Sequence, residues 1–147
     1  MYRIHFFNDQ GKYQVPIYRE EVKATLEIVF TYKNLVPGIR VTQSDEVVFE
    51  TEFGRVVWPE IEQDQLAEVE RAFPPAPKAS ALDALPVYMA AIDRARDADL
   101  DSREPAFNQL RSAEVPLLAY AASEGLNLNH YAYRQAEEII YEISEQQ

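Results

Sequence analysis

The sequence predicts an α+β fold, with a small antiparallel sheet and one helix followed by a helical bundle of three to four helices. Apolar residues in the first 60 positions alternate at the two-residue period of strands, whereas those after residue 61 recur at helical intervals. Three prolines among residues 74–77 interrupt regular structure, because proline neither continues a helix nor donates to a sheet ladder. We therefore predict a small α+β domain at residues 1–60 and an acidic helical domain at residues 61–147, with a stiff proline-rich connector at residues 74–79.

Strands are predicted at both ends of the first half. Residues 2–7 and 13–17 alternate apolar and polar side chains on either side of a turn at residues 8–11. Pro16 removes a ladder donor, so the second of these strands is predicted at a sheet edge or at a bulge. A meander of three further strands is expected over 39–42, 46–53 and 55–58, with turns at 44–45 and at Gly54.

One helix is predicted between these strands. Val22, Leu26, Val29 and Phe30 share a helical face, although the β-branched and aromatic residues at 28–32 favour a strand instead. Pro37 and the glycine after it should end this helix.

The second half is predicted to be helical. A short amphipathic helix over 61–73 precedes the prolines, and the next helix begins near Ser80 or near Pro86. Another helix opens at Pro105, where Pro116 should kink or divide it and Gly125 should cap it. A last helix should follow Asn127 or Asn129.

Composition excludes several classes of function. The chain has 147 residues and no cysteine, which rules out disulfides, thiolate metal sites and a cysteine nucleophile. Its net charge of −11 argues against direct nucleic-acid binding. Residues 61–147 hold seven basic and 16 acidic residues, so −9 of this charge lies in the second half. The longest apolar run, residues 115–122, is too short to span a membrane, and no signal peptide is recognisable, so we expect a cytoplasmic protein.

The acidic string at residues 97–101 has the alternating carboxylates that begin a calcium-binding loop. Ser102 stands where such a loop needs glycine, and Asn108 stands where it needs a bidentate glutamate. We therefore predict a solvated loop and no metal site. A divalent metal bound by Asp97, Asp99 and Asp101 remains the alternative.

The other candidate groups favour ordinary structural roles. His5 is predicted to be a partly covered residue of a half-buried sheet, and His130 a residue at a helix start. Glu50 and Glu52 should be solvated charges on the strand face opposite Phe49 and Phe53. The glutamates at 137 and 138 carry no catalytic pattern, and glycine-rich phosphate loops are missing. We predict no catalytic or cofactor-binding residues.

Tyrosines cluster near the end of the chain among acidic residues. Tyr131 and Tyr133 cannot both face inward on one helix, so at least one should be exposed or cover a neighbouring element. Tyrosine is frequent at interface hot spots, whereas packing against the first half is an equally good explanation. The predicted partner-binding residues are Tyr120, Tyr131, Tyr133, Glu137 and Glu138.

These features favour a non-enzymatic acidic interaction module that docks on a basic, nucleic-acid-binding surface of a partner protein. Immunity proteins, antitoxins and phage-encoded inhibitors of this kind share its charge and size, and the analogy extends no further. Two alternatives stay open. One is a motif-less metal-dependent hydrolase that uses the aspartate cluster, and the other is an assembly subunit that pairs through the sheet edge at residues 13–18.

Overall fold

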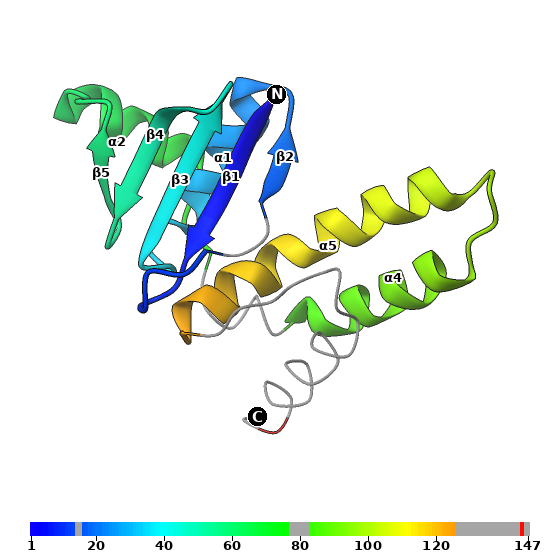
Figure 1. The fold of residues 1–147 in the computed structure, drawn as a ribbon. Helices are drawn as coiled ribbons and strands as arrows, with labels where there is room; N and C mark the ends of the chain where they lie inside the picture. The colour runs from blue at the N-terminus through cyan, green and yellow to red at the C-terminus, as the bar shows by residue number, and fades with distance from the viewer. Residues whose placement is uncertain (14–15, 77–82, 126–144, 146–147) are drawn as a thin grey trace.

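A computed structural model of the chain describes residues 1–13, 16–76, 83–125 and 145 (Figure 1). This part contains a five-stranded antiparallel sheet and four helices, which confirms the predicted α+β class. In chain order the elements are β1 (Tyr2–Phe7), β2 (Ile17–Arg19), α1 (Val22–Tyr32), β3 (Gly38–Gln43), β4 (Glu46–Glu52), β5 (Arg55–Trp58), α2 (Gln63–Ala72), α4 (Leu85–Asp97) and α5 (Arg103–Ser123).

The sheet has the strand order β2-β1-β3-β4-β5. Strand β2 lies at an edge, as Pro16 predicts, but it runs over Ile17–Arg19, whereas the predicted strand covers residues 13–17. Strands β3, β4 and β5 form the predicted meander. Ser44 and Asp45 have φ angles of 51° and 66°, so this turn matches the right-handed twist of the strands. The second turn holds Phe53 and Gly54, at φ 49° and 81°. The predicted place of Phe53 on the apolar strand face is wrong, because Phe53 is a turn residue that is 83% exposed.

Helices cover one face of the sheet. Ile4 and Phe6 of β1 are buried in the same core as Val29 and Phe30 of α1. Figure 1 shows α1 and α2 behind the sheet, and no described helix crosses β3, β4 or β5 on the other side. Side chains alternate along a strand and opposite residues of neighbouring strands share a face. We therefore define the open face as the side that carries Arg3, His5, Phe7, Arg40, Glu50 and Glu52.

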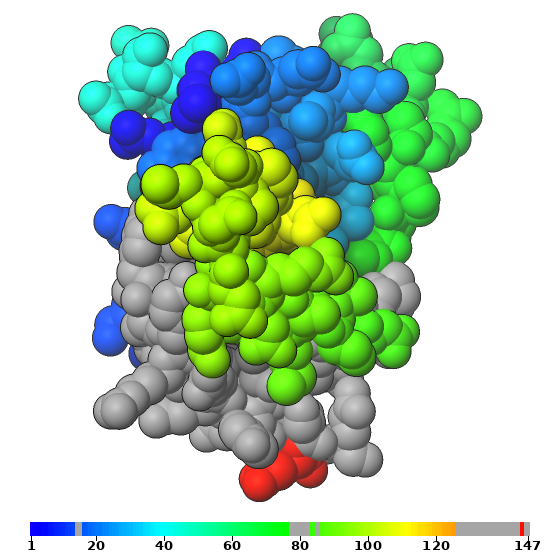
Figure 2. All heavy atoms as spheres, turned by 90° about the vertical axis from the view of Figure 1, so that its right-hand side faces the viewer, coloured from blue at the N-terminus to red at the C-terminus, as the bar shows by residue number. Residues whose placement is uncertain are grey.

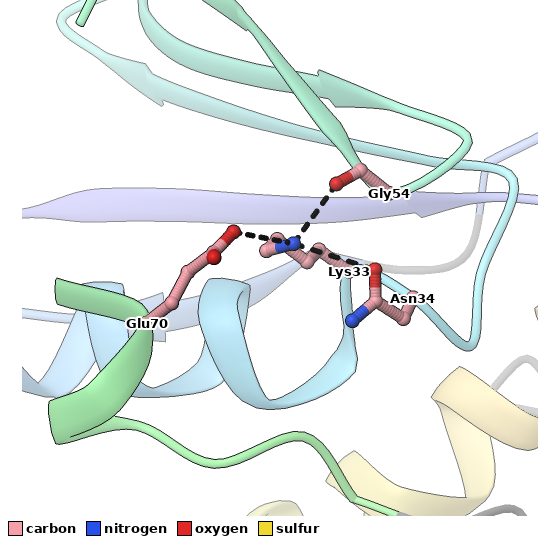
Figure 3. A network of polar contacts seen from close by, with 4 residues as sticks. All are labelled: Lys33, Asn34, Gly54 and Glu70. Atoms are coloured by element: carbon pink, nitrogen blue, oxygen red, sulfur yellow. Dashed lines mark hydrogen bonds and ion pairs between the residues drawn. The ribbon is translucent and has the colours of Figure 1, made fainter. Parts of the chain in front are cut away.

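Helix α2 packs on the first half of the chain through a polar network (Figure 3). Lys33 Nζ lies 3.1 Å from Glu70 Oε1 and donates to the Gly54 carbonyl oxygen at 2.9 Å. Next to it, the rings of Phe30 and Phe73 stack with their centroids 6.5 Å apart. Figure 2 shows the green atoms of α2 against the blue atoms of α1. The division at residues 60 and 61 stays a prediction, but these contacts attach α2 to the sheet.

Helices α4 and α5 form an antiparallel hairpin that extends away from the sheet (Figure 1). The C-terminal half of α5 is buried on nearly all sides, and its residues belong to the same core cluster as β1 and α1. The predicted division at Pro116 is wrong, because α5 continues through it. Burial of Val115, Leu117 and Leu118 around this proline stabilises the helix, and Ser112, whose carbonyl loses its helical donor, is exposed.

Gly125 caps α5 as predicted, with φ 77° and its N–H donating to the Ala122 carbonyl oxygen at 3.2 Å. In the connector, Pro74 and Pro75 are exposed and the Ala76 N–H donates to the Thr31 carbonyl oxygen at 2.9 Å. The rest of the connector and the predicted last helix lie outside the described residues. In the described part, no helix is both long and apolar enough to cross a membrane.

Candidate functional site

The structure describes one of the five predicted partner-binding residues, Tyr120. Tyr120 is only 4% exposed, within the buried half of α5. This is a correction, because the structure places Tyr120 in the core and not on a surface that a partner can reach. Tyr131, Tyr133, Glu137 and Glu138 lie outside the described residues and stay predictions, as does the helix-start position of His130.

The acidic string at residues 97–101 connects α4 to α5. Asp99 Oδ1 accepts hydrogen bonds from the N–H and the hydroxyl of Ser102, at 2.9 and 2.8 Å. These bonds lower the pKa of the Asp99 carboxyl. No group of three potential metal ligands occurs among the residues that the structure describes. Asp99 therefore supports the start of α5 with its carboxylate.

His5 is half-buried on the open face, as the sequence predicts. Its ring meets the ring of Tyr13 edge to face, with the centroids 5.3 Å apart. Burial lowers the pKa of the His5 imidazole, and the positive charges of Arg3 and Arg40 lower it further. His5 is therefore a neutral, aromatic member of the face at pH 7.

Four residues form a row across the sheet in direct register. His5 of β1 pairs with Arg40 of β3, Arg40 pairs with Glu50 of β4, and Glu50 pairs with Trp58 of β5. Such cross-strand neighbours lie close enough for their side chains to interact. Sequence reasoning did not find this row, because it depends on which strands are adjacent.

Arg40 organises the centre of the open face. Its Nε and Nη2 donate to Glu50 Oε1 at 3.1 and 2.9 Å, and its guanidinium carbon lies 5.0 Å from the ring centroid of Phe7. Glu50 is thus half-buried and paired, which differs from the predicted solvated charge. The prediction is confirmed for Glu52, which is exposed. Phe49 lies in the core, as expected.

A pocket of ≈ 280 Å³ adjoins this arginine at one end of the sheet. We call it the Gly38 pocket, after one of the strand residues that line it. Its walls combine aromatic rings, carboxylates and the Arg40 side chain, contributed chiefly by Phe7, Asp9, Arg40, Glu50, Glu52 and Phe53. The only signal for it in the sequence is Gly38 among larger strand residues, and the sequence alone favours a helix-terminating role for that glycine.

Comparisons of the chain with protein-family models, with curated proteins and with solved structures found no match.

Proposed function

We propose that the protein is a non-enzymatic interaction module that binds a basic, nucleic-acid-binding surface of a partner protein and inhibits that partner. Long-range attraction between opposite charges accelerates the encounter of two proteins and selects against acidic partners. A net charge of −11 on 147 residues supplies such a field. Tyr131, Tyr133, Glu137 and Glu138 remain part of this proposal.

One observation carries the proposal. Every described carboxylate of residues 61–125 is exposed, except that of Glu114. Glu70 is paired with Lys33, whereas the other acidic residues of α2 have no ion-pair partner among the described residues. Their charge is therefore directed to solvent and is available to an approaching partner. Exposed negative charge also favours solubility, so the test must separate the two roles.

The test is affinity capture followed by measurement of the association rate. The bait is the full chain, compared with a double charge reversal of exposed helix residues, Glu68→Lys with Asp93→Lys. The control bait changes the net charge equally on the first half, through Glu20→Lys with Glu46→Lys, which are also exposed. We expect a basic protein to be captured by the native and control baits, and weakly by the reversed one.

Salt gives the second criterion. Screening acts over about 10 Å at 0.1 M ionic strength, so added salt should slow association more than it alters dissociation. Capture of an acidic partner would contradict the proposal, as would an association rate that does not change with salt concentration. An equal loss of captured partner with both double variants would also contradict it. The charge would then serve solubility.

A second candidate, assembly through the sheet edge, is favoured by β2. This strand lies at the edge, and the nearby Tyr13 and Tyr18 are 60% and 37% exposed. An unpaired strand edge can add a strand from another copy. A molar mass that rises with concentration, and that Tyr18→Lys returns to the monomer value, would support this candidate.

A further inference from the structure

The Gly38 pocket exists because glycine places no side chain on the open face between Phe7 of β1 and Glu52 of β4. A Cβ built on Gly38 would lie 3.6 Å from Phe7 Cβ and 3.5 Å from the Thr51 carbonyl oxygen, which are ordinary contact distances. Alanine at this position would therefore narrow the pocket without strain. The volume of ≈ 280 Å³ is just below the range of drug-sized ligand sites and suits a single side chain.

The pocket carries negative charge beside aromatic rings. Asp9 and Glu52 are exposed, and neither has an ion-pair partner among the residues that the structure describes. Glu50, by contrast, is neutralised by Arg40. Two carboxylates that form no ion pair, next to Phe7 and Phe53, favour a cation that also has a flat apolar surface.

The chain already shows how these groups hold such a cation. Arg40 lies over the Phe7 ring at 5.0 Å and gives two hydrogen bonds to a carboxylate oxygen of Glu50. Phe53 and Glu52 offer the same pair of groups, a ring and a carboxylate. Arg55 of β5 is the cross-strand neighbour of Glu52, but the two form no ion pair among the described residues.

Phe53 is held in a costly position. A bulky residue at φ 49° is uncommon, and 83% exposure of an aromatic ring loses the gain from burial. Asparagine would fit this turn better. A residue that is unfavourable in the free protein is explained if a ligand covers its ring in the complex.

We propose that the Gly38 pocket binds the guanidinium group of an arginine on the basic partner. This inference rests on the proposed function and names the group that the partner inserts. Arginine is favoured over lysine because its planar guanidinium stacks on rings and donates in parallel to carboxylates, whereas the ammonium of lysine is a compact, strongly hydrated charge.

The experiment titrates the full ¹⁵N-labelled chain with an acetylated, amidated tetra-arginine peptide, and separately with tetra-lysine. We expect the largest amide shifts at Gly38, Glu52 and Gly54. Glu52→Gln should weaken tetra-arginine binding by about tenfold, the usual effect of removing a charge-assisted hydrogen bond. Gly38→Ala should weaken it by roughly threefold or more because it narrows the pocket. Tetra-lysine should bind about tenfold more weakly than tetra-arginine.

The matched control is Glu46→Gln, which removes the same charge from an exposed position at the far end of β4. We expect it to change binding by less than about twofold, as for a screened surface charge. Retained amide spectra of the three variants establish that each is folded.

Three results would overturn the inference. The first is equal affinity for the two peptides. The second is an equal loss of tetra-arginine affinity with Glu46→Gln and with Glu52→Gln. The third is a set of amide shifts confined to the helices. The proposed function is judged apart from them by the capture experiment. A basic partner that binds Gly38→Ala as tightly as the native chain would refute the pocket alone. Failure to capture a basic partner, with tetra-arginine still bound at the pocket, would refute the proposed function and leave only a guanidinium site without that partner.

Discussion

Lys33 and Glu70 form an ion pair that joins the end of α1 to α2, with 3.1 Å between Nζ and Oε1 (Figure 3). The lysine side chain is 6% exposed and the glutamate side chain 43%. A buried ammonium group must be compensated, and here the Gly54 carbonyl oxygen and the Asn34 side chain complete its set of acceptors. The pair therefore links a helix end, the turn between β4 and β5, and α2.

Glu70→Gln should lower the free energy of unfolding by about 1–2 kcal/mol, because Lys33 keeps its buried charge and loses its counter-charge. The glutamate is partly exposed, so the loss should be smaller than for a fully buried pair. Urea denaturation at pH 7 measures it. The control, Glu68→Gln, lies on the same helix and has no ion pair among the described residues, and it should cost less than about 0.5 kcal/mol. Equal losses would contradict a specific role for the pair.

Thr51 buries a hydroxyl that has no hydrogen-bond partner among the described residues. Thr51→Val keeps the shape of the side chain and removes the unsatisfied group, so it should raise the unfolding free energy by about 1 kcal/mol. Thr25 is an equally buried control, since its Oγ1 donates to the Glu21 carbonyl oxygen at 2.8 Å. Thr25→Val should therefore destabilise the chain. Thermal denaturation of both variants checks the opposite signs, and destabilisation by Thr51→Val would refute this reading.

The sequence predicts where the helices and strands of this fold lie better than it predicts which of them are adjacent. The alternation of Tyr2, Ile4 and Phe6 follows from local chemistry, as does the edge position of the strand predicted around Pro16, and both are confirmed. The bounds of that strand differ, because β2 is Ile17–Arg19. The β-branched residues that favour a strand at 28–32 are helical instead, because Ile28, Val29 and Phe30 gain burial against the sheet.

The candidate site was missed for a different reason. Arg40 and Phe7 are 33 positions apart in the printed sequence, and only the pairing of β1 with β3 places them together. The prediction for Tyr120 is wrong because an aromatic residue near acidic neighbours fits an interface as well as a core. Its burial depends on how α5 enters the centre of the molecule, which the weak periodicity of that helix does not show.

Gly125 joins the end of α5 to the turn after β1. Its carbonyl oxygen accepts a hydrogen bond from the Asn8 side chain at 3.2 Å, and a Cβ on this glycine would lie 2.7 Å from Asp9 Oδ1. Gly125→Ala should therefore cost more stability than the roughly 1 kcal/mol expected from a positive φ alone. Gly11→Ala is the control, with φ 75° and no atom within 4 Å of its built Cβ. Chemical denaturation compares the unfolding free energies of the two variants. An equal loss of stability in both would show that the Asp9 side chain moves away from the new methyl group at no cost.

Glu114 should make stability depend on pH. This buried residue of α5 has its pKa raised to about 7 by burial, against the opposing effect of Arg111. An unfolded glutamate has a pKa near 4.5. Between these values the folded chain keeps a proton that the unfolded chain releases, so the stabilisation is complete below about pH 4.5 and is lost as pH rises through about 7.

Glu114→Gln keeps a neutral side chain at every pH, so its unfolding free energy should fall less than that of the native chain between pH 5 and pH 8. The gain over the native chain should reach at most about 3 kcal/mol at pH 8 and fall to about 1 kcal/mol or less at pH 5. Urea denaturation at both pH values measures it, with the exposed Glu104→Gln on the same helix as control. If Glu114→Gln lowers stability equally at both values, the carboxyl is ionised throughout and its contacts stabilise the charged form.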